Sequence, residues 1–333
     1  MKTTGMISLL LAVAGAAITA PAVTYAGTVV YEPFNYPSLS DGTIFASSGS
    51  GGVTTAANAQ GLTGSYVATT SWPGVHDAIY DTSGPGFSGM QATGGAVTVS
   101  APTNGSGSTD LSVQLAPGAT LSGNTLYGSY LFDPGTTGAS SMAFGISDAS
   151  SGSYLPNAQF TINRNGGLYG FGQTGSDTGT GQVFSSTTNS GTVVSPGTTY
   201  LQLFEVTGVN ATSGSVSMAD WVLTDAQYQF FVANGGISAA NLDANPSEVL
   251  QSGSATITSP TAYPQFNNGV GSGLGNYMVL AEYDTNTIYT DIRLSGTSLA
   301  DVAPTPEPAT LGLMAVAGAG LLLIGRRKVR GRV

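Results

Sequence analysis

Short runs of residues in which apolar and polar side chains alternate are the feature that most constrains the fold of this chain. In residues 288–294, Ile288, Ile292 and Leu294 fall on one face of an extended strand. Tyr289 falls on the opposite face, together with both charged side chains of the run. Similar runs, bounded by Gly, Pro, Asn and Ser, occupy residues 96–100, 111–115, 125–132, 142–146, 159–162, 200–206, 215–223, 255–258 and 277–283.

Helical periodicity is nearly absent from the rest of the chain. Only residues 225–232 and 238–242 suggest short helices, and residues 46–64 and 81–95 are rich in Gly, Ser and Thr, as surface loops are. With 48 glycines and only 8% charged residues, the composition does not fit a helical bundle or a coiled coil. We therefore predict an all-β protein, a jelly-roll β-sandwich spanning residues 27–303.

The charges are distributed unevenly along the chain. Between residues 27 and 303 the only basic residues are Arg164 and Arg293, against 17 acidic ones, so the formal charge of this region is 2 − 17 = −15. Such a surface repels nucleic acid and attracts divalent cations. A bound Ca²⁺ is therefore one alternative, although the sequence does not indicate its ligands. The absence of cysteine excludes disulfides and thiolate metal sites.

The N-terminus has the order of a secretory signal peptide. Lys2 precedes an apolar stretch over residues 6–18, and Ala26 supplies a small residue at a cleavage position. We predict a signal peptide over residues 1–26, export through the Sec translocon and cleavage after Ala26. The alternative is a buried N-terminal helix, which Gly15 and Pro21 disfavour.

The C-terminus has the order of a membrane anchor. Residues 309–325 are apolar, and as a helix they would span about 25 Å, enough for a single transmembrane helix. A basic tail follows, which would hold the end of the chain on the cytoplasmic side of the membrane. Its residues are Arg326, Arg327, Lys328, Arg330 and Arg332.

Pro306, Glu307 and Pro308, followed by this apolar segment and basic tail, resemble the PEP-CTERM sorting signal of diderm bacteria. The resemblance covers residues 304–333. It implies recognition by the membrane protease exosortase, transient anchoring in the inner membrane and processing near Glu307. Delivery to the cell surface or the extracellular polysaccharide matrix would follow. The alternative is a plain C-terminal anchor that is never cut.

A second resemblance covers the region between these two signals. The segments 31–36, 196–201, 290–297 and 300–302 are similar to those of exported laminin-G-like jelly rolls of the concanavalin type. The resemblance implies that the first and last strands pair, which would bring residues 31–36 beside residues 288–294. It says little about activity, because one fold hosts many functions.

Candidate catalytic residues are few. His76 is the only histidine, so two-histidine zinc sites are excluded, and a Ser-His-Asp site would have to use it. Glu282, Asp284 and Asn286 resemble the Glu-x-Asp-x-Glu strand of laminarinase-like jelly-roll glycosidases, but Asn286 cannot act as the acid. For Arg293 we expect a structural role on the polar side of the last strand, paired with a carboxylate such as Asp291 or Glu32.

Aromatic residues in or beside the expected loops suggest binding without catalysis, because exposed rings stack on sugars. Trp72 and Tyr80 are the chosen candidates for a glycan site; the others are Tyr154, Tyr169, Phe171, Tyr263 and Phe266. We expect a non-enzymatic protein of the cell surface or matrix that contacts extracellular polysaccharide or serves as a structural coat. The alternative is a polysaccharide-active jelly-roll enzyme, a glycosidase or a lyase.

Overall fold

The computed structural model describes a β-rich region between residues 28 and 303. The described residues are 28–47, 51–56, 58–70, 77–87, 94–100, 108–121, 123–134, 141–147, 158–163, 167–173, 180–185, 194–258, 266, 277–283 and 286–303. The predicted signal peptide, sorting motif and basic tail lie outside these ranges. Within them, no helix is long and apolar enough to cross a membrane; the predicted span 309–325 is not among them.

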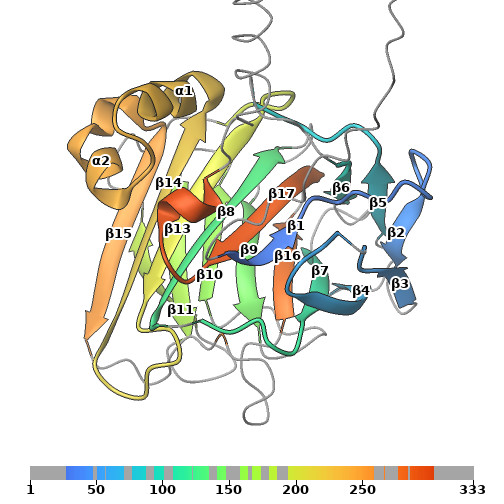
Figure 1. Ribbon diagram of the computed structural model, residues 1–333, viewed down its shortest axis with the longest axis horizontal. Helices are drawn as coiled ribbons and strands as arrows, with labels where there is room; N and C mark the ends of the chain where they lie inside the picture. The colour runs from blue at the N-terminus through green and yellow to red at the C-terminus, as the bar shows by residue number, and fades with distance from the viewer. Residues whose placement is uncertain are drawn as a thin grey trace, which may run out of the picture.

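Two antiparallel sheets form the molecule (Figure 1). The nine-stranded sheet has the order β15-β14-β13-β8-β17-β6-β5-β2, with β1 paired to β17. Its strands are β1 (Thr28–Glu32), β2 (Ile44–Ser47), β5 (Asp77–Asp81), β6 (Ala96–Val99), β8 (Thr125–Asp133), β13 (Tyr200–Thr207), β14 (Ser215–Thr224), β15 (Gln251–Thr258) and β17 (Thr287–Ser295).

The second sheet has eight strands in the order β12-β11-β10-β9-β16-β7-β4-β3. They are β3 (Gly51–Thr54), β4 (Leu62–Thr70), β7 (Ser108–Leu115), β9 (Ser141–Ser147), β10 (Ala158–Asn163), β11 (Gly167–Gln173), β12 (Thr180–Ser185) and β16 (Tyr277–Tyr283). The chain crosses repeatedly between the sheets, for example at β7–β8, β8–β9 and β16–β17, as expected of a jelly roll. The predicted all-β sandwich is thus confirmed.

Short helices pack on the outer face of the nine-stranded sheet. The predicted helix at 225–232 is α1 (Asp225–Ala233), which begins after Thr224 because Thr224 and Gln227 form a capping box. The predicted helix at 238–242 is α2 (Ala239–Ala244), followed by the 3₁₀ turn η1 (Pro246–Glu248), and α3 (Leu299–Val302) follows the last strand. The loop expected at 46–64 was wrong in part, because β3 lies within it and pairs with β4.

The first and last strands pair, as the second resemblance implied: Tyr31 lies opposite Arg293 and Glu32 opposite Ile292 (Figure 1). The predicted alternation of faces in the last strand holds for Ile292 and Leu294, after Asp291, but is wrong for Tyr289, before it. That residue has a φ of 51° at a bulge between β17 and β8. The extra residue turns Tyr289 into the core, where Ile292 and Leu294 also lie.

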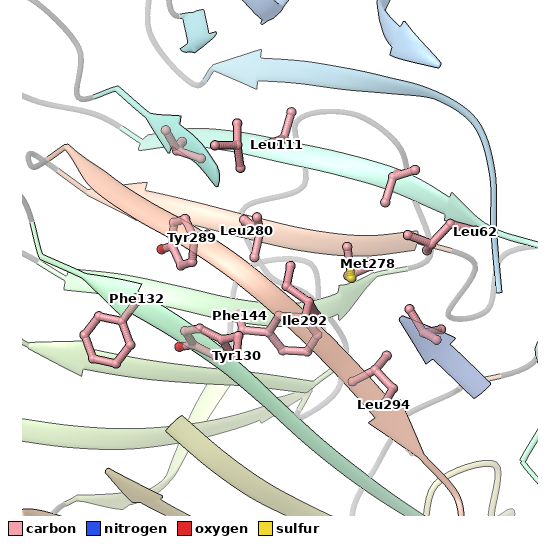
Figure 2. Packing of buried hydrophobic residues seen from close by; sticks show 14 of the residues in the cluster. Leu62, Leu111, Tyr130, Phe132, Phe144, Met278, Leu280, Tyr289, Ile292 and Leu294 are labelled. Atoms are coloured by element: carbon pink, nitrogen blue, oxygen red, sulfur yellow. The ribbon is translucent and has the colours of Figure 1, made fainter. Parts of the chain in front are cut away.

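The main core fills the space between the two sheets (Figure 2). Tyr130 from one sheet stacks on Phe144 from the other, with ring centroids 5.6 Å apart. A second apolar cluster lies on the opposite face of the nine-stranded sheet, where Tyr228 and Phe231 of α1 pack in the same cluster as Trp221. That face is therefore covered by helices at one end.

Candidate functional site

The segment that follows β1 turns sharply around a buried carboxylate. Glu32 is fully buried, and its side chain accepts hydrogen bonds from the backbone N–H of Phe34 at 2.7 Å and from the Tyr36 hydroxyl at 3.3 Å. Phe34 has a φ of 51°, which the bond back to Glu32 helps to hold. The chain thus turns sharply where it leaves β1.

A third donor reaches Glu32 from the other sheet. The hydroxyl of Tyr66, in β4, donates to Oε2 of Glu32 at 2.5 Å. Burial nevertheless raises the pKa of Glu32 to about 7, and the three hydrogen bonds oppose that rise. Burial and the charge of Glu32 also raise the pKa of Tyr36 and of Tyr66, so both phenols stay protonated.

Aromatic rings surround this carboxylate. Tyr36 packs edge-on against Phe45 and Tyr80, with centroids 5.1 and 5.9 Å away, and Phe45 contacts the ring of Tyr66 at 4.7 Å. Tyr80 was expected beside a loop with an exposed ring. It lies instead in β5, only 4% exposed, and its hydroxyl accepts from the N–H of Tyr36 at 3.3 Å. Its ring is part of the core, because alternate residues of β5 face inward.

A cleft of about 540 Å³ opens beside this cluster. Its lining residues come from the turn after β1 and from the β3 region: Asn35, Tyr36, Pro37, Ser38, Val53, Thr54, Ala56 and Asn58. The Tyr36 hydroxyl accepts from the N–H of Ala56 at 3.3 Å, which ties the two walls together. Pro37, Ser38 and Asn58 are exposed, so the cleft is accessible to a ligand.

The described lining of this cleft is polar and uncharged. Amides and hydroxyls can donate and accept hydrogen bonds, and the exposed ring of Pro37 offers apolar surface. Among the described residues that line the cleft there is no carboxylate, histidine, lysine or arginine. The arrangement can therefore hold a neutral, hydroxyl-rich molecule.

Several residues chosen from the sequence lie outside the described part of the chain: Ala26, Trp72, His76, Asp284, Pro306, Glu307, Pro308 and the basic tail. Glu282 belongs to β16, where its Cα lies opposite Thr109 and Met142. Asn286 is exposed just before β17. Among the described residues, no group of three or more His, Cys, Asp and Glu side chains could hold a metal ion.

Arg293 pairs with Asp291, at 3.0 Å, as predicted. The other predicted partner, Glu32, instead accepts hydrogen bonds from Phe34, Tyr36 and Tyr66. Arg293 is also buried rather than on an open polar face, with 4% exposure, and its guanidinium lies 5.2 Å from the centroid of the Tyr31 ring. Phe266, expected in a loop, is fully buried, and its N–H donates to Asn210 at 2.6 Å.

Sequence reasoning missed the Glu32 cluster and the cleft beside it. From the sequence, Glu32 is predicted only as a possible partner of Arg293, and the segment 31–36 only as similar to a family. The sequence signal for this cluster is a single acid within a short run that also holds Tyr31, Phe34 and Tyr36. Its meaning depends on Tyr66, which lies 34 positions away and in the other sheet.

No protein-family model matches the chain, and no curated protein does so either. Solved structures with a remote likeness include a carbohydrate esterase from the Shiga toxin-encoding bacteriophage phi24B, with 12% identity and a TM-score of 0.34, covering 69% of this chain and 88% of that one. The PL-14 alginate lyase of Aplysia kurodai has 10% identity, a TM-score of 0.35, and coverage of 65% and 86%.

The metal-free exoplasmic/lumenal domain of VIP36 has 9% identity and a TM-score of 0.36, with coverage of 65% of this chain and 85% of that one. These scores describe a remote likeness, so a function for this chain has to be argued from its own residues. Those residues define a two-sheet antiparallel β-sandwich with a neutral, polar cleft at the end of its first strand.

Proposed function

We propose that this protein is exported and contacts glycan at the cell surface or in the extracellular matrix without cleaving it. The observation that carries the proposal is the cleft beside Tyr36, with amides from Asn35 and Asn58 and hydroxyls from Ser38 and Thr54. None of its described lining residues is charged. Sugars bind through such hydrogen bonds and through contact with aromatic or proline rings. The cleft is large enough for a short stretch of polysaccharide.

The two ends of the sequence support the location. The order of charge, apolar residues and Ala26 is that of a signal peptide, and Pro306-Glu307-Pro308 with the apolar segment and basic tail resembles a sorting signal. On this proposal exosortase removes the C-terminal segment after transient anchoring in the inner membrane. We also propose that the chain belongs to the laminin-G-like family. A Ca²⁺ ion that bridges protein and glycan, and a contact of Trp72 with the glycan, are further parts of the proposal.

The competing function is a polysaccharide-active enzyme on the same sandwich. Retaining glycosidases need two carboxyl groups about 5 Å apart, and the run Glu282, Asp284, Asn286 has an amide where the third acid would stand. A glycan array with the purified protein, run with and without EDTA, and reducing-sugar release from glucans, galactans and alginate separate the two functions. We expect binding without release; turnover that Glu282→Gln abolishes would establish the enzyme instead.

A further inference from the structure

Two hydrogen bonds connect the buried carboxylate of Glu32 to both walls of the neutral cleft. The hydroxyl of Tyr36 donates to Oε2 of Glu32 at 3.3 Å, and its oxygen accepts from the backbone N–H of Ala56, also at 3.3 Å. Tyr36 belongs to the wall that follows β1, and Ala56 belongs to the wall that follows β3. The Tyr36 hydroxyl is thus the point at which Glu32 is linked to the spacing of the two walls.

The ionised form of Glu32 satisfies every donor that reaches it. Its Oε1 accepts from the N–H of Phe34, and its Oε2 accepts from the hydroxyls of Tyr36 and Tyr66. An ionised carboxylate offers about four lone-pair sites and donates nothing, so three donors can be accommodated at once. In this form the Tyr36 hydroxyl is held at Glu32 and in reach of Ala56.

A proton on Glu32 changes this arrangement. The protonated carboxyl group donates one hydrogen bond and loses one acceptor site, so the two phenols compete for fewer lone pairs. Tyr66 donates at 2.5 Å and Tyr36 at 3.3 Å, so the longer bond from Tyr36 is the one that gives way. A buried phenolic hydrogen without an acceptor is unfavourable, and the Tyr36 hydroxyl therefore turns toward the cleft to find another.

The surroundings of Glu32 leave its protonation responsive to the pH of the solution. The titratable side chains around it are phenols, those of Tyr36, Tyr66 and Tyr80. On the neighbouring strand β17, Arg293 lies opposite Tyr31 and pairs with Asp291. None of the described residues forms an ion pair with Glu32. Burial is thus not offset by a cation, and it raises the pKa of Glu32 to about 7.

We infer that Glu32 is a positioning residue for the neutral cleft: its ionised carboxylate keeps the Tyr36 wall tied to Ala56, and its protonation loosens that tie. The inference deepens the proposed function and rests on it for the glycan. Glycan binds to the form in which the walls are tied, so affinity rises with pH. Over the same interval the stability of the fold falls, because the buried charge is costly. A purely structural role of Glu32 would move binding and stability in the same direction.

Hydrogen exchange of the Ala56 amide tests the inference without a ligand. NMR gives its protection factor at pH 5, 6, 7 and 8, corrected for the intrinsic pH dependence of exchange. We expect protection to rise at least about tenfold from pH 5 to pH 8. Glu32→Gln, which resembles the protonated acid, and Tyr36→Phe, which removes the acceptor, should each keep protection low at every pH.

Asp110→Asn is the matched control. Asp110 is also a buried acid whose pKa burial raises to about 7, but it lies in β7 of the other sheet and does not line the cleft. The variant should keep the rise in Ala56 protection. Protection that stays constant or falls from pH 5 to pH 8 in the wild-type protein would overturn the inference, as would a rise that Glu32→Gln retains.

Titration calorimetry with the neutral glycan that binds most tightly on the array is the second readout. The dissociation constant should be about tenfold smaller at pH 8 than at pH 5 for the wild-type protein and for Asp110→Asn, and independent of pH for Glu32→Gln. Equal affinity at both pH values would overturn the inference and leave the proposed function standing. If no glycan on the array binds, the proposed function fails, and the exchange of Ala56 decides whether Glu32 positions the wall.

Discussion

The hydroxyl of Tyr66 donates a 2.5 Å hydrogen bond to the buried carboxylate of Glu32, and this contact joins the two sheets of the sandwich. Glu32 lies at the end of β1, and Tyr66 lies in β4 of the opposite sheet. The same carboxylate holds the turn that forms one wall of the neutral cleft. One ionisable group, Glu32, therefore contributes both to the contact between the sheets and to the shape of the cleft.

Stability should fall as the pH rises from about 4.5 to 7. Burial raises the pKa of Glu32 from 4.5 to about 7, so the folded state binds a proton more tightly than the unfolded state does. Asp110 acts in the same direction, because burial raises its pKa from 3.8 to about 7. The stabilisation by protonated Glu32, up to about 3 kcal/mol, is complete below pH 4.5 and is lost as the pH rises through about 7.

Urea unfolding at pH 5, 6, 7 and 8 measures this dependence. Glu32→Gln should flatten part of the slope between pH 5 and 7, and Asp110→Asn should flatten another part. A wild-type protein that gains stability over this interval would contradict the assignment.

Removing the phenol that bridges the sheets should destabilise the protein and make Glu32 harder to ionise. Tyr66→Phe deletes one of three donors to a fully buried carboxylate, which should cost about 1 to 3 kcal/mol at neutral pH. The pH at which stability is lost should also move upward. Tyr127→Phe, at a partly exposed tyrosine, serves as the control and should change stability by less than about 0.5 kcal/mol.

Arg293 should contribute more to stability than an exposed ion pair does. It is 4% exposed, pairs with Asp291 at 3.0 Å and lies over the Tyr31 ring. Arg293→Ala leaves Asp291 without its cation and should cost about 3 kcal/mol in denaturant unfolding. Glycan binding should stay unchanged at a temperature where the variant is folded. Loss of binding with unaltered stability would assign Arg293 to the ligand site.

The alternation of apolar and polar residues was enough to predict the class of fold and most strands, since each pattern is local. The prediction failed at Asp291, because the bulge there arises from pairing with β8 and cannot be recognised from the alternation within the strand itself. Tyr80 was misplaced because an aromatic residue next to a Gly-rich segment is as compatible with a strand as with a loop. The cleft was not predicted, because its walls meet only after β1 and β3 are brought together.

Processing at both ends should be visible in the mature protein. Mass spectrometry of surface material should find an N-terminus near Gly27 and no peptide from residues 311–333, because each end pairs an apolar segment with a cleavage context. Recovery of Arg326 or Arg330 in intact surface protein would contradict the sorting proposal.

The central claim is that the cleft beside Tyr36 binds glycan without cleaving it. The most direct test is titration calorimetry with the glycan that binds most tightly on the array. It compares the wild-type protein with Asn35→Ala and Asn58→Ala. Gln114→Ala, which removes an exposed amide in β7, is the matched control. We predict a wild-type dissociation constant of about 10 µM to 1 mM, weakened roughly tenfold by either cleft variant, unchanged by the control, and no sugar released. Wild-type affinity in both cleft variants, or release of reducing sugar from the bound glycan, would contradict the account.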